Sequence, residues 1–75
     1  MKMSIEDVFI YAEMGISEQI GNIKKMMREI EFYRDLGKST PEQEERYKKL
    51  SGWLEDWEKK LTRLKRTAKE NNIRL

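Results

Sequence analysis

A regular spacing of hydrophobic residues marks the second half of the chain. Its apolar side chains recur in alternating steps of three and four residues. This spacing gathers them on one face of a helix, and its repeat of seven residues is typical of helices that pack against each other. The residues of this stripe are Tyr47, Leu50, Leu54, Trp57, Leu61, Leu64 and Ala68. The pattern predicts a helix over about residues 41–70.

A longer helix is predicted over about residues 4–36, with a less regular stripe. One heptad position holds Phe9, Ile16, Ile23 and Ile30, and the other holds Ile5, Ala12, Gln19, Met26 and Tyr33. A glycine inside a helix costs about 1 kcal/mol relative to alanine, so Gly15 could break this helix, with Ser17 capping a new one. The repeat nevertheless runs through Gly15 in phase, which favours one continuous helix and leaves three helices as the alternative.

Strong helix-capping signals separate the two helices, in the segment DLGKSTPEQ. Gly37 suits the left-handed position that ends a helix. Thr40 is a good N-cap, Pro41 fits the first helical position, and Gln43 completes a capping box with Thr40. The segment therefore predicts a helix end, a turn over residues 37–40 and a new helix start.

The two stripes can be aligned if the chain folds back at this turn. Residue i of the first helix should then face residue 77 minus i of the second. Three oppositely charged pairs agree with this register: Glu29 with Arg46, Arg34 with Glu44, and Glu13 with Lys65. We therefore predict a single all-α domain over residues 1–75, folded as an antiparallel two-helix hairpin. The last residues, from Asn71 to Leu75, are expected to fray.

Length and composition limit how this hairpin can be stabilised. The chain has 75 residues and contains neither Cys nor His. Disulfides and metal sites built on thiolate or imidazole ligands are thereby excluded, and one core of this size rarely supplies more than about 3–5 kcal/mol. Self-association is the remaining means of support, and a dimeric four-helix bundle is the form that we expect. The lack of Cys is compatible with a reducing cytoplasm, where we expect the protein to act.

Candidate chemistry is sparse, although 40% of the residues are charged. Without His or Cys, a general base or nucleophile would have to be a carboxylate, Lys, Tyr, Ser or Thr. The carboxylates lie where helix capping and solubility require them, and no nucleotide-binding, calcium-binding or zinc-protease motif occurs. We expect a protein that is not an enzyme and needs no cofactor or metal.

The segment DVFIYAEMGI of the first helix is apolar on nearly every side. The hairpin stripe accounts for Phe9 and Ile16, but it leaves a second apolar stripe without a partner. This second stripe consists of Ile10, Tyr11, Met14, Ile20 and Met27. Helices that are apolar all round are normally buried all round, so we expect another protein chain to cover it. A membrane surface is disfavoured because the interleaved polar residues are acidic. Trp53, beside the second helix's stripe, is a further candidate contact.

A basic segment ends the second helix. Residues 59–75 carry a net charge of +6 and residues 1–58 a net charge of −4. Lys59, Arg63 and Arg66 share one strip at helical spacing, as contacts to nucleic-acid phosphates would. The same residues could simply stabilise the helix dipole and balance the acidic first helix. We expect a non-enzymatic protein–protein interaction or regulatory module, with DNA or RNA binding and a purely structural assembly role as alternatives.

Overall fold

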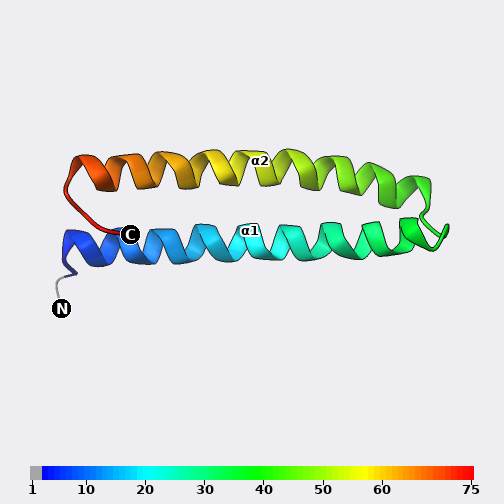
Figure 1. The fold of residues 1–75 in the computed structure, drawn as a ribbon, viewed down its shortest axis with the longest axis horizontal. Coiled ribbons are helices and arrows are strands. Elements are labelled where there is room, and N and C mark those ends of the chain that lie inside the picture. The colour runs from blue at the N-terminus through cyan, green and yellow to red at the C-terminus, as the bar shows by residue number, and fades with distance from the viewer. Residues whose placement is uncertain (1–2) are drawn as a thin grey trace.

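The protein is a hairpin of two long antiparallel helices, seen in a computed structural model that describes residues 3–75 (Figure 1). Helix α1 spans Ile5–Asp35 and helix α2 spans Pro41–Glu70. The predicted hairpin is confirmed, and the predicted ranges 4–36 and 41–70 lie within one residue of these bounds. The hairpin measures 51 × 23 × 16 Å, so it is a single layer of two helices lying side by side.

Helix α1 is continuous. Ser4 caps its start by accepting a hydrogen bond from the Asp7 backbone N–H at 3.1 Å. The helix passes through Gly15 without a break, so the three-helix alternative is wrong. Gly37 ends it with a φ of 69°, and the N–H of Lys38 donates to the Tyr33 carbonyl at 2.8 Å. This is a Schellman motif, in which glycine takes the left-handed position at no steric cost.

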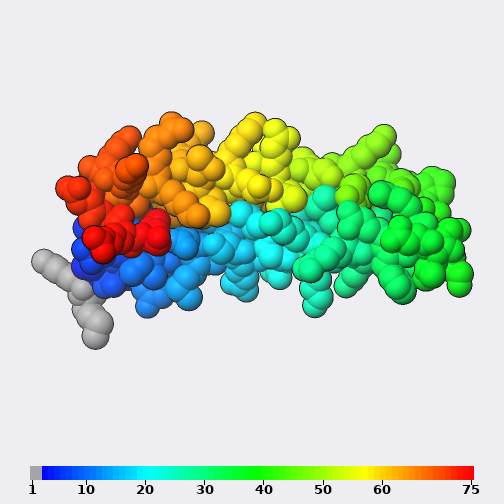
Figure 2. All heavy atoms as spheres, viewed as in Figure 1, coloured from blue at the N-terminus to red at the C-terminus, as the bar shows by residue number. Residues whose placement is uncertain are grey.

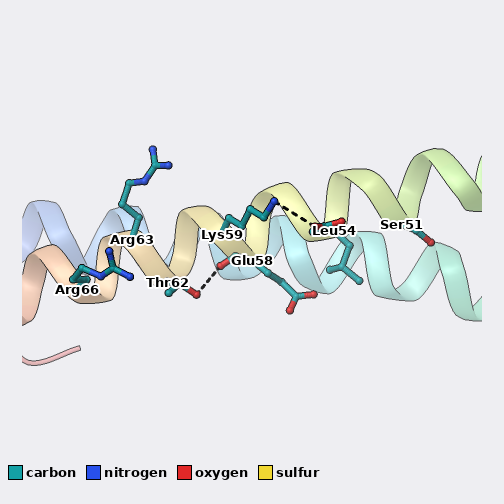
Figure 3. Close-up of a pocket in the computed structure, with 8 residues that line it drawn as sticks. Ser51, Leu54, Glu58, Lys59, Thr62, Arg63 and Arg66 are labelled. Carbon is teal, nitrogen blue, oxygen red and sulfur yellow. Dashed lines mark hydrogen bonds and ion pairs between the residues drawn. The ribbon is translucent and has the colours of Figure 1, made fainter.

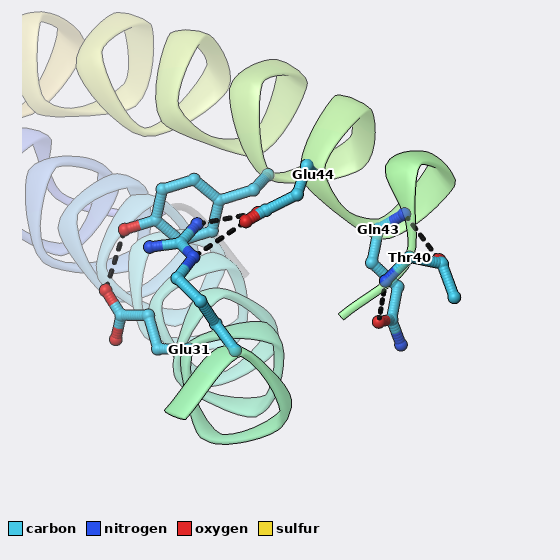
Figure 4. A network of polar contacts seen from close by, with 6 residues as sticks. Glu31, Thr40, Gln43 and Glu44 are labelled. Atoms are coloured by element: carbon cyan, nitrogen blue, oxygen red, sulfur yellow. Dashed lines mark hydrogen bonds and ion pairs between the residues drawn. The ribbon is translucent and has the colours of Figure 1, made fainter. Parts of the chain in front are cut away.

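The start of α2 is the capping box that the sequence predicts. The Thr40 hydroxyl accepts from the Gln43 N–H at 3.1 Å, and the Gln43 side chain accepts from the Thr40 N–H at 3.0 Å (Figure 4). Two backbone donors that would otherwise lack a partner at the helix start are thereby satisfied.

The C-terminal residues do not fray as expected. Asn72 adopts a φ of 57°, and the Ile73 N–H donates to the Ala68 carbonyl at 2.8 Å, which makes a second Schellman motif. The side chains of Ile73 and Ala68 are both buried. This is the apolar contact that commonly accompanies the motif, and it turns the tail back toward the start of α1 (Figure 1).

The core is a narrow line of contact between the two helices. Ile23, Ile30 and Leu50 form its centre, and only 1% of Leu50 is exposed. Partly buried side chains pack around this centre: Met26, Met27, Tyr47, Leu54 and Trp57. Figure 2 shows the two helices in contact along the whole length of the hairpin.

The side of α1 that faces α2 differs from the predicted one. Ile20 is buried and Met27 packs against the core, although both were placed on the outer stripe. Conversely, Ile5, Gln19 and Tyr33 were placed in the core and are exposed. The helix is turned about its own axis, so that the residues at its first heptad position and those four residues further along both face α2. Ile20 and Met27 therefore lie at the core and not on the outer stripe.

A polar network joins the helices next to the turn (Figure 4). The Arg34 guanidinium donates two hydrogen bonds to the Glu44 carboxylate, at 2.7 and 2.8 Å, and lies 4.6 Å from the centre of the Tyr47 ring. The Tyr47 hydroxyl donates to Glu31 at 2.7 Å. The hydrogen bonds from Arg34 hold the pKa of Glu44 below its ordinary value of 4.5, and the bond to Glu31 raises the pKa of Tyr47 above 10.0.

The predicted charge pairing is confirmed in one of its three pairs, Arg34 with Glu44. Within residues 3–75, neither Glu29 with Arg46 nor Glu13 with Lys65 forms an ion pair. Arg46 instead donates to the Met26 sulfur at 3.8 Å. A bidentate Arg–carboxylate pair next to a short turn needs less ordering of long side chains than a single exposed pair in mid-helix, which explains why this one forms.

A matched pair of substitutions in α1 tests the position of the core. Ile23→Ala is expected to lower the free energy of unfolding by about 2–5 kcal/mol, because only 4% of Ile23 is exposed and its removal leaves a cavity. Ile10→Ala, the same change at an exposed site, should cost much less. Urea unfolding at one fixed protein concentration measures both, and equal losses would contradict this account of the core.

The turn network predicts a step in stability at acid pH. The pKa of Glu44 is lower in the folded chain than in the unfolded one, so the pair contributes stability above about pH 4.5 and loses it as the pH falls through the folded pKa. Arg34→Gln should reduce this loss, whereas Glu45→Gln, at an exposed neighbour, should not. Urea midpoints measured between pH 3 and pH 7 provide the comparison. An unchanged pH profile in Arg34→Gln would contradict the assignment.

Candidate interaction surfaces

Three of the predicted partner-binding residues lie exposed near the start of α1. The exposed fractions are 44% for Ile10, 62% for Tyr11 and 60% for Met14. Helical spacing makes Tyr11 and Met14 neighbours, as are Ile10 and Met14, so the three form one patch. We call it the α1 patch. Acidic residues one turn away on either side, Asp7 and Glu18, give it a negative border.

The two other predicted residues of that stripe are not available at the surface. Ile20 is buried between the helices. Met27 packs against the core and lies beside Leu54 of α2. Their placement on the outer surface is therefore corrected, and they do not belong to the α1 patch.

Trp53 is 54% exposed but lies away from the α1 patch. It is on α2, opposite about residue 24 of α1, which is ten residues and thus roughly 15 Å along the axis from Met14. Its side of the hairpin is fixed by the contact of Arg46 with Met26, because Trp53 follows Arg46 by seven residues and so points the same way. The structure does not combine Trp53 with the α1 patch into one surface.

The two sides of the hairpin differ sharply in composition. Helical spacing from Met26 and Arg46 defines what we call the lateral apolar face, formed by Ile5, Ala12, Met26 and Tyr33 of α1 and by Trp53, Trp57 and Leu64 of α2. Spacing from Glu31 and Glu44 defines the opposite lateral charged face, formed by Ser17, Lys24 and Glu31 of α1 and by Glu44, Ser51, Glu58 and Lys65 of α2. The hairpin therefore has one mainly polar side and one side that is richer in apolar residues.

Polar residues interrupt the lateral apolar face on both helices. Gln19 is exposed on α1, between Ala12 and Met26, and Arg46, Lys60 and Thr67 share the helical row of Trp53 on α2. On α2, the Lys60 ammonium lies 4.3 Å from the centre of the Trp57 ring. This cation–π contact holds the lysine charge over the ring of Trp57, itself a member of the face.

The predicted basic strip is brought together on α2. Lys59, Arg63 and Arg66 line one shallow groove (Figure 3). The groove is not uniformly basic, because Glu55 and Glu58 also line it and Lys59 pairs with Glu55 at 3.3 Å. Neither Arg63 nor Arg66 forms an ion pair with the described part of α1, so the expected balance with the acidic first helix is not made by direct contacts.

The described residues show no cluster typical of a metal centre. Across residues 3–75, no three His, Cys, Asp or Glu side chains gather as they would around a metal ion. Every buried side-chain polar atom described has a hydrogen-bond partner. Neither α1 nor α2 contains a segment long and apolar enough to cross a membrane.

Comparison with known proteins yields no match: no protein family, no curated protein and no solved structure corresponds to this chain. The function must therefore be argued from the surfaces themselves.

Sequence reasoning overlooked one feature, an apolar hollow on the lateral apolar face. It lies between the helices and is lined by Phe9, Ile16, Lys60, Arg63, Leu64 and Thr67. The spacing of seven residues from Trp53 to Lys60 and from Lys60 to Thr67 was the available signal, since it puts all three on one side of α2.

Proposed function

We propose that the chain is a non-enzymatic interaction module that acts as a homodimer, with two hairpins joined into a four-helix bundle. The observation that carries the proposal is the lateral apolar face, which has no second layer to cover it. Stable domains place at least two layers of secondary structure around a core, and two helices side by side supply only one. A second copy would supply the missing layer.

The size of the exposed surface supports this. The chain exposes 6313 Å², whereas a compact folded chain of its mass exposes about 4,900 Å². Its radius of gyration is 16.5 Å, against about 11 Å for a compact domain of this length. The excess, about 1,400 Å² per chain, corresponds to about 2,800 Å² in a dimer, which lies within the range of ~2,000–5,000 Å² buried by obligate homodimers.

The α1 patch would remain exposed in such a dimer, because its residues do not belong to the lateral apolar face. It suits a protein partner that offers a small apolar groove with basic residues at its edge, since Asp7 and Glu18 border the patch. The regulatory or adaptor role that we propose is to present two such patches on one rigid dimer.

DNA or RNA binding through Lys59, Arg63 and Arg66 is the second candidate. It is supported by the position of all three residues in one exposed groove. It is weakened by the two glutamates in the same groove, which would repel phosphate. A purely structural assembly role, the third alternative, would require the α1 patch to be covered by further copies.

Self-association is tested by light scattering over micromolar concentrations. We expect a mass of twice 9.1 kDa and a urea midpoint that rises with protein concentration, because unfolding then also dissociates the dimer. A well-folded monomer at every concentration would refute the proposed dimer.

The α1 patch is tested with the double variant Tyr11→Ser/Met14→Ser. The variant should remain a dimer but should no longer bind the protein partner of the wild type, as measured by calorimetry with that partner. Phe32→Ser is the matched control, because Phe32 is an equally exposed aromatic on the same side of α1, three heptads away. Partner binding that survives in the double variant would contradict the proposal. A salt-sensitive complex with nucleic acid, lost in Lys59→Gln/Arg66→Gln, would favour the second candidate.

A further inference from the structure

The lateral apolar face is uneven along its length. Trp53 lies in the half of α2 nearer the turn and is 54% exposed. The other end holds the apolar hollow, whose volume is about 360 Å³. The hollow is shallow and open, and its volume, near the lower end of the ~300–1,000 Å³ typical of ligand pockets, leaves room for one indole ring.

Trp53 cannot fill the hollow of its own chain. Arg63, at the centre of the hollow's α2 wall, lies ten residues from Trp53 and therefore roughly 15 Å further along the helix. Both nevertheless lie on the same side of α2, because Lys60 lines the hollow and follows Trp53 by seven residues.

We propose that Trp53 of each copy enters the hollow of a second copy, so that two hairpins pack antiparallel through their lateral apolar faces. This inference rests on the proposed self-association and specifies how it occurs. The floor of the hollow is apolar, formed by Phe9, Ile16 and Leu64. Arg63 also lines the hollow, and an arginine guanidinium stacks well on an indole ring.

The position of the two-fold axis follows from this docking. The two-fold axis must bring Trp53 of each copy onto the hollow of the other, whose centre lies near Arg63. It therefore crosses α2 midway between these two residues, next to Trp57. The facing point on α1 is residue 19. Gln19 would then meet Gln19 of the second copy, a single polar pair of the kind that fixes register in helical bundles.

The rest of the face agrees with this axis. Ala12 and Met26 lie seven residues on either side of Gln19, and Ile5 and Tyr33 lie fourteen residues on either side. A smaller side chain on one copy therefore meets a larger one on the other in both pairs, as interdigitated packing requires. A parallel arrangement would instead place hollow over hollow and Trp53 over Met26, leaving voids at one end and crowding at the other.

Substitutions at the two complementary features test the docking. Trp53→Ala should raise the dimer dissociation constant at least about 30-fold, as expected when a central tryptophan anchor is lost. Thr67→Trp should also weaken the dimer, because the new ring fills the hollow of its own chain. Tyr11→Ala removes an equally exposed aromatic outside the face and should leave the constant unchanged. Sedimentation equilibrium measures the constant, and circular dichroism confirms that each variant is helical.

Cysteine variants test the orientation, since the chain has no cysteine of its own. Gln19→Cys should form a disulfide-linked dimer under mild oxidation, whereas Ser17→Cys, on the lateral charged face, should not. Ala12→Cys and Met26→Cys should cross-link when mixed, but not separately, because two copies of residue 12 would lie about 21 Å apart.

The outcomes separate this inference from the proposed function. The antiparallel docking would be overturned, while self-association stands, by either of two results. One is that Trp53→Ala has the same dimer dissociation constant as the wild type, and the other is that Gln19→Cys forms no disulfide-linked dimer. A wild type that is monomeric would overturn both. Weakening by Trp53→Ala and Thr67→Trp together with linkage at residue 19 would establish the arrangement.

Discussion

Two helices can touch along one line only, and this constraint governs the whole molecule. Each helix buries the side that faces its neighbour and leaves the rest to solvent or to another chain. Among residues 3–75 the buried set is accordingly small, and Leu50, with 1% exposed, is the most fully enclosed of its large side chains. A chain with this little enclosed apolar volume lies near the limit of independent stability. The apolar residues left outside the contact line then decide what the protein can bind.

The ends of the helices compensate for part of this weakness. Both helix starts are capped by a side chain, and both helix ends close in Schellman motifs. The ion pair between Arg34 and Glu44 joins the two helices next to the turn. At the opposite end, buried Ile73 holds the tail back against Ala68. These local contacts align the helices and so determine which residues meet across the contact line and which remain on the lateral faces.

Much of this could be predicted from the sequence, for identifiable reasons. The turn was readable because capping depends on residue types at fixed short spacings, as Thr40 and Gln43 show. The register was readable because the two apolar stripes align only when the chain folds back at that turn, which also brings Arg34 next to Glu44. In α2 the apolar residues form a single stripe, so only one side of the helix could be the buried one. In α1 apolar residues occur on several sides, so the rotation of the helix depends on side-chain packing, and Ile20 and Met27 were misplaced.

The candidate surfaces were predictable only in part. Exposure of Tyr11, Met14 and Trp53 follows from helical spacing once each helix is known to pack against the other along one side. Helical spacing shows which side of α2 the hollow lies on, but its existence was not predictable, because it depends on how Phe9, Ile16 and Leu64 fill the space between two helices at one end. Likewise, Ile73 is buried because Asn72 takes a left-handed conformation, which glycine adopts far more often than asparagine.

The central claim is that a second copy covers the lateral apolar face, side by side with the first. Small-angle X-ray scattering tests this most directly, because it reports mass and shape in one measurement. The account predicts forward scattering for two chains of 9.1 kDa, a longest dimension still near 51 Å and a radius of gyration close to the 16.5 Å of one hairpin. Scattering from a single chain, or from a dimer much longer than one hairpin, would contradict it.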